Sequence, residues 1–157
     1  MKRWMCGLMA ALMILTMSCG AAAEQQVQLP DCRYSLTLPD GMEYDGPGED
    51  PDSAKFAYVS EKLGLDIQFF SYDAQGQELK TLAELLRENG RDAELYKINQ
   101  IEMIVYRVTD PEDLPEKGMK CIGYVLKDDG MIIEICFWYA TKNAAKLTEE
   151  IIGSIGE

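Results

Sequence analysis

Residues 131–139 read MIIEICFWY, and this run is the strongest indication of strand structure in the chain. It is dominated by β-branched and aromatic side chains, which favour strands. Residues 119–126 (MKCIGYVL) have the same character, and only Lys-Asp-Asp-Gly at 127–130 lies between the two runs. We therefore predict a β-hairpin that turns at 127–130.

The register of this hairpin decides which side chains share a face. If Leu126 pairs with Met131, Cys121 lies opposite Cys136 and the apolar residues of both strands align on one face. This register predicts a Cys121–Cys136 disulfide, which an exported protein permits, although an anaerobic host would leave both thiols free. The alternative turn, with Gly130 as a bulge, shifts the pairing by one residue and places the cysteines on opposite faces.

Further strands are predicted on the N-terminal side of the hairpin, the first of them by a clear alternation of apolar and polar residues. They cover residues 32–38, 55–60, 65–72, 93–98 and 101–108. In the first of them Cys32 alternates with Tyr34 and Leu36, which predicts a buried, unpaired thiol. The polar residues 24–30 predict a frayed leader.

Two helices are predicted. Thr81 and Glu84 form a capping-box pattern at the start of a short amphipathic helix over residues 82–89, which Gly90 ends. Thr141 caps a final helix, whose apolar residues recur every three or four positions at Ala144, Leu147, Ile151 and Ile155. Most links between the strands are too short for parallel crossovers. The predicted fold is therefore α+β, a largely antiparallel sheet with helices packed on its faces.

The start of the chain has the features of a signal peptide. Lys2 and Arg3 are followed by an apolar run at 8–17 and by alanines at 21–23, so we expect cleavage before Glu24 and a single domain over residues 24–157. The apolar run is too short to remain as a membrane-spanning helix. Residues 16–20 (TMSCG) also resemble a bacterial lipobox, in which Cys19 would be lipidated.

Composition excludes several functions. The chain of 157 residues has 27 acidic and 15 basic side chains, and loss of Lys2 and Arg3 with the leader leaves 13 basic ones. Nucleic acids and anionic membrane surfaces would repel such a domain. There is no histidine, which excludes Ser-His-Asp and Cys-His catalytic sites and His-ligated zinc. We find no motif for a catalytic site or a cofactor.

Acidic residues concentrate in two predicted loops, at 40–52 and 110–117. Carboxylates in the first loop could in principle converge on Ca²⁺, but their spacing does not match an EF-hand and two prolines restrict the loop. We expect both loops to be solvated and to lack a tight metal site, so that 1 mM Ca²⁺ would not raise the melting temperature.

The order of the elements resembles one known family. The opening YSLTLPDG at 34–41, the helix that starts at Thr81, the strand through 133–135 and the closing helix that ends in IIGSI at 151–155 are similar to the PsbP-like sandwich family. The resemblance implies an α/β/α sandwich around an antiparallel sheet and a role in protein binding or assembly at a membrane surface. It implies no catalytic residues.

Three functions remain possible on these observations. We favour a noncatalytic exported module that binds a protein or a small molecule at the cell envelope. Trp138 alternates with Glu134 and Cys136 on the more polar face of its strand, so Glu134 and Trp138 are candidate partner contacts. The alternatives are an acid/base hydrolase that uses loop carboxylates and an envelope protein anchored by lipid at Cys19.

Overall fold

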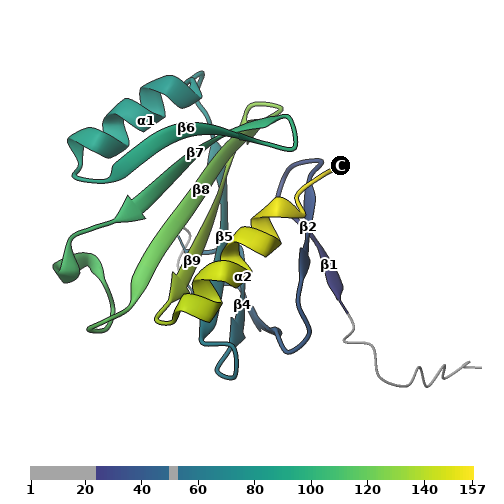
Figure 1. The fold of residues 1–157 in the computed structure, drawn as a ribbon. Helices are drawn as coiled ribbons and strands as arrows, with labels where there is room; N and C mark the ends of the chain where they lie inside the picture. Colours follow the sequence, from purple (N-terminus) through teal and green to yellow (C-terminus); the bar gives the residue numbers. More distant parts are fainter. Residues whose placement is uncertain (1–23, 50–52) are drawn as a thin grey trace, which may run out of the picture.

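The computed structural model describes residues 24–49 and 53–157, so the predicted signal peptide and Cys19 lie outside the described residues. Within those ranges the chain forms one seven-stranded sheet in which every neighbouring pair is antiparallel (Figure 1). The strands lie in the order β3 (Glu43–Gly46), β4 (Phe56–Ser60), β5 (Leu65–Asp73), β9 (Met131–Tyr139), β8 (Lys120–Asp128), β7 (Ile101–Val108) and β6 (Asp92–Ile98).

The remaining elements cover the two faces of this sheet. The two-stranded sheet of β1 (Gln25–Gln28) and β2 (Ser35–Leu38) and the helix α2 (Lys142–Gly153) share one core with one face. The helix α1 (Leu79–Glu88) lies on the other face, over β6, β7 and β8 (Figure 1). The predicted α+β fold with helices on both faces is confirmed.

The strand β9 shows why this sequence gives two cores. Its residues Ile133, Ile135 and Phe137 are fully buried toward α2, whereas Ile132 and Cys136 are buried toward α1. A strand buried on both faces needs apolar residues at consecutive positions, as the MIIEICFWY run provides. β9 therefore lies inside the sheet, between β5 and β8.

The predicted register of the β8–β9 hairpin is wrong by two residues. Asp129 and Gly130 both have positive φ, of 44° and 80°, and form a two-residue turn in which Asp128 pairs with Met131. Asp-Gly favours such tight turns, so β8 continues two residues further than the wider turn allowed, whereas β9 begins at Met131 as predicted. Cys121 therefore pairs with Trp138 and not with Cys136, and both thiols are free in this structure.

Two stretches that were predicted as irregular contain short strands. Residues 25–28 are not frayed but pair with β2, and residues 43–46, inside the predicted acidic loop, pair with β4 at the edge of the sheet. The second helix α2 begins at its predicted cap, where Thr141 Oγ1 accepts a hydrogen bond from the Ala144 amide at 3.1 Å. The first helix begins three residues earlier than predicted, with Glu78 as its N-cap.

The described part of the chain contains no helix that is both long and apolar enough to cross a membrane.

Candidate functional site

The face of the sheet that carries α1 is only partly covered. α1 lies over β6, β7 and β8, whereas six side chains of β5 and β9 on the same face remain half-exposed or exposed, beside the buried Ile132 and Cys136. We call this set the open face, and it consists of Asp66, Gln68, Phe70, Tyr72, Glu134 and Trp138. The predicted contacts Glu134 and Trp138 thus share one surface, as their alternation indicated.

Glu134 is held in place by a neighbour on β7. The Tyr106 hydroxyl donates a hydrogen bond of 2.5 Å to Glu134 Oε1 and lies 3.3 Å from Cys136 Sγ. Burial, with the nearby Cys136 and Glu134, raises the pKa of Tyr106, so the hydroxyl keeps its proton and remains a donor. The carboxylate therefore forms a fixed acidic point on the open face.

Tyr106 reaches Glu134 because its partner across the β7–β8 ladder is Gly123. A Cβ atom at position 123 would lie 2.2 Å from the Tyr106 ring, a distance at which two carbon atoms overlap. The absence of a side chain at Gly123 lets the ring lie flat across β8 toward β9.

A pocket of about 420 Å³ lies where β5 begins and β9 ends. We call it the Asp66 pocket. Asp66 and Trp138, which pair across the β5–β9 ladder, contribute to its wall together with Gln68, and residues 112–115 and Met119 form the opposite side.

Two polar atoms of this pocket lack partners. Asp66 Oδ1 and Trp138 Nε1 are both shielded from water, and neither has a hydrogen-bonding partner among the described residues. Burial raises the pKa of Asp66, and the neighbouring Asp45 carboxylate raises it further. Buried polar atoms in folded proteins nearly always have a hydrogen-bonding partner, so an unpaired acceptor and an unpaired donor in one pocket need an explanation.

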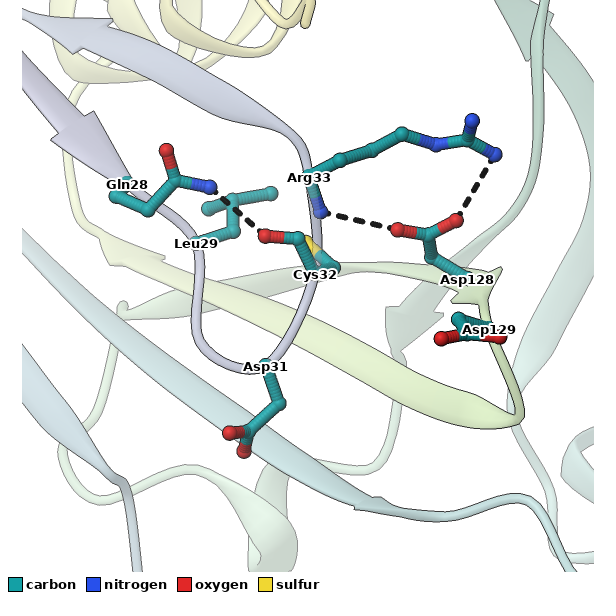
Figure 2. Close-up of a pocket in the computed structure, with 7 residues that line it drawn as sticks. All are labelled: Gln28, Leu29, Asp31, Cys32, Arg33, Asp128 and Asp129. Carbon is teal, nitrogen blue, oxygen red and sulfur yellow. Dashed lines mark hydrogen bonds and ion pairs between the residues drawn. The ribbon is translucent and has the colours of Figure 1, made fainter.

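A larger pocket, of about 710 Å³, lies between the β1–β2 turn and the β8–β9 turn (Figure 2). Here Asp31, Arg33 and Asp128 are already paired. Arg33 Nη2 lies 3.0 Å from Asp128 Oδ1, and the Arg33 amide donates to Asp128 Oδ2 at 3.0 Å. Asp31 accepts a hydrogen bond from the Ser71 hydroxyl. We interpret this region as a fastening between the two sheets and not as a ligand site.

The described residues of the two predicted acidic loops give no ligand cluster for a metal. Among residues 24–49 and 53–157, no group of three or more His, Cys, Asp or Glu side chains is placed to hold an ion. Asp50 and Asp52, which belong to the first loop, lie outside the described residues. In the second loop, Asp113 is bound by Arg91, with Nη1 and Oδ2 2.6 Å apart.

Of the open face, only Glu134 and Trp138 were predicted as contacts, and neither Asp66 nor the supporting residue Tyr106 was among them. Asp66 was counted only as part of a strand, although a carboxylate inside an apolar strand is a signal in itself. Tyr106 was not singled out either, and glycine at position 123 inside a strand was the signal that another side chain approaches closely.

Comparison with known proteins identifies the fold. No protein-family model matches the sequence, and no curated protein sequence does either. The structure is similar to the solution structure of cyanobacterial PsbP (CyanoP) from Synechocystis sp. PCC 6803, with a TM-score of 0.60 and 11% identity over 88% of this chain and 94% of that one.

A second similar structure is a protein from Bacteroides thetaiotaomicron VPI-5482, with a TM-score of 0.53 and 17% identity. The match covers 78% of this chain but only 44% of that chain. The chain therefore has a PsbP-like fold, as the order of its elements indicated.

Proposed function

We propose that this protein is a noncatalytic, exported binding or assembly module that contacts its partner through the open face. One observation carries the proposal: on the neighbouring strands β5 and β9, aromatic and acidic side chains remain accessible beside a helix that covers β6, β7 and β8. Tyr72, at 42% exposure, is the most accessible of them. Aromatic residues are enriched in interfaces because a rigid ring buries a large area at low entropic cost.

The position of Glu134 supports the same proposal. A carboxylate fixed by Tyr106 is already oriented, so a partner donor can bind it with little further loss of side-chain entropy. Export is supported by the charged start, the short apolar run and the alanines at 21–23.

Photocrosslinking in cells of the native host tests the proposal. A photoreactive p-benzoylphenylalanine in place of Tyr72 should give one dominant adduct on irradiation. The same group in place of Lys146, whose side chain is 79% exposed on α2 at the other face, is the control and should not give that adduct. Equal labelling from both positions, or no adduct from position 72, would contradict the proposal.

The Asp66 pocket favours a second candidate, the acid/base hydrolase. It places Glu112 and Asp113 in the same pocket as a carboxyl whose pKa is raised by burial, as acid/base pairs require. A panel of chromogenic glycosides tests it. If the wild-type protein hydrolyses a glycoside and each of the variants Asp66→Asn and Glu112→Gln abolishes the hydrolysis, the protein is an enzyme and the proposal of a noncatalytic module is wrong.

A further inference from the structure

The Asp66 pocket gives more specific information about the ligand than the rest of the open face. It joins that face at Asp66, Gln68 and Trp138, so a partner seated on β5 and β9 can extend into it. The inference that follows rests on the proposed function and names the chemistry of the partner.

The charges of the pocket are unbalanced. Asp66, Glu112 and Asp113 line it, and the Arg91 guanidinium, which binds Asp113, is the one basic group with a described ion pair to any of the three. Outside the pocket, Asp45 adds further negative potential at Asp66. A cation is therefore the ligand that this electrostatic field favours.

The lining is suited to an organic cation and not to a metal ion. Leu114, Pro115, Met119 and the Trp138 indole are poor metal ligands, and the described residues offer no three-residue group of metal-binding type here. An indole ring attracts alkylammonium and guanidinium groups over its face, and apolar walls accommodate the methylene stem of a basic side chain.

The two unpaired atoms indicate what else the ligand carries. Asp66 can present either carboxylate oxygen by rotating about its terminal torsion, which is broad, and it needs an N–H donor. Trp138 Nε1 can only donate, so it needs an acceptor. A basic residue within a peptide supplies both groups, the donors in its side chain and the acceptor in its backbone carbonyl.

We propose that the Asp66 pocket binds an arginine or lysine side chain presented by a peptide segment of the partner protein. Asp66 receives the cationic head group, and the Trp138 ring lies along the stem. The Trp138 N–H, which is shielded in the free protein, donates to the peptide carbonyl once the indole turns toward the ligand.

Titration with two short peptides tests the proposal on the full chain labelled with ¹⁵N-tryptophan. The probe is acetyl-Gly-Arg-Gly-amide, and the control is the same peptide with citrulline, a neutral isostere of arginine. We expect a saturable shift of the Trp138 indole N–H signal with the arginine peptide and at least tenfold weaker binding of the citrulline peptide. The variant Trp138→Phe assigns the signal, since Trp4 is the other tryptophan.

Two variants with the same change of charge separate the pocket from a general electrostatic effect. Asp66→Asn should weaken binding of the arginine peptide at least tenfold, whereas Asp129→Asn, in the turn at the opposite end of β9, should leave it unchanged. Thermal melts of both variants establish that they fold. Equal binding of the two peptides, or equal loss in the two variants, would overturn the proposal.

The outcomes also separate this inference from the proposed function. If the adduct from position 72 persists in Asp66→Asn and the arginine peptide does not bind, the open face is a binding surface but the pocket is not a cation site. If the arginine peptide binds in the pocket and no adduct forms from position 72, the pocket is a cation site and the proposed partner surface is wrong.

Discussion

Gly123 is a single residue on which the geometry of the open face depends. It lies in the middle of β8, where glycine normally weakens a strand, and the Tyr106 ring occupies the space that a side chain would fill. The same ring carries the hydroxyl that holds Glu134. The packing of the Tyr106 ring and the orientation of the half-buried Glu134 carboxylate are thus linked through one missing Cβ.

We predict that Gly123→Ala destabilises the protein by about 1–3 kcal/mol, because the methyl group displaces a buried ring. Chemical denaturation measures the change. Gly153→Ala is the matched control, since a Cβ there meets no atom within 4 Å and the stability should not fall. The double variant Gly123→Ala/Tyr106→Ala, in which the ring is absent, should lose less stability than the sum of the losses in the two single variants. Additive losses would show that the ring and the glycine are not coupled.

Asp66 should make the stability of the protein depend on pH. Its folded pKa is raised, so the folded protein keeps the proton at a pH where the unfolded chain, with a pKa near 3.8, has lost it. Stability attributable to this group therefore falls as the pH rises from about 3.8 through the folded pKa.

We predict that Asp66→Asn melts at a higher temperature than the wild-type protein at pH 7. The difference should vanish at about pH 3, where the Asp66 carboxyl of the wild-type protein is neutral in both the folded and the unfolded state. Melting curves across this range measure it. Asp129→Asn removes the same charge from an exposed turn and is the control. A variant less stable than wild type at pH 7 would contradict the prediction.

At the scale of elements, the two sheets are joined through the turns at one end of the molecule. Asp128, only 7% exposed, accepts a hydrogen bond from the Arg33 amide and forms an ion pair with the Arg33 guanidinium (Figure 2). These two interactions connect the β1–β2 turn to the end of β8. Burial of a carboxylate is tolerated because it has these two partners.

We predict that Asp128→Ala lowers the stability by about 1–2 kcal/mol, because the Arg33 amide loses its acceptor. Hydrogen exchange at the β1–β2 turn should become faster. Glu157→Gln is the control, since Glu157 contacts the same guanidinium at 3.4 Å but is 67% exposed. If both variants exchange alike, Asp128 does not fasten the turn.

Elements with a strong apolar pattern could be predicted from the sequence, and those without one could not. The strands β4 to β9 and the helix α2 carry dense apolar patterns, and they lie where expected to within two residues. The strands β1 (QQVQ) and β3 (EYDG) have almost no apolar residues, and each exists because a neighbour offers backbone hydrogen bonds. Pairing with a neighbour is not encoded in the local pattern.

The candidate site could likewise be predicted only where it depends on the local sequence pattern. Alternation along 131–139 was sufficient to place Glu134 and Trp138 on one face. Asp66 could not be added, because it meets Trp138 only through the β5–β9 pairing, which joins segments far apart in the sequence. The two-residue error in the β8–β9 register kept every side chain on its predicted face but moved Cys121 from directly opposite Cys136 to a diagonal position beside it.

At the scale of the whole molecule, the acidic residues all lie at Glu24 or later, after the predicted signal peptide. Lys2 and Arg3 are the only charged residues before Glu24. We predict that protein from the native host begins at Glu24, which mass spectrometry of the intact chain and of its N-terminal peptide would show. A chain that begins at a lipidated Cys19 would instead favour the anchored envelope protein.

The topology has a consequence for how the chain reaches its native state. β5 and β9 are neighbours although α1, β6, β7 and β8 lie between them in the sequence, and Ser35 pairs with Gly156 almost at the C-terminus. Such distant pairings make folding slow, on the order of milliseconds to seconds. In a chain delivered N-terminus first, β3, β4 and β5 must wait with an unpaired edge until residues 131–139 emerge. The last strand to arrive is the one that joins the two halves of the sheet, so the nascent protein remains prone to aggregation until β9 has emerged.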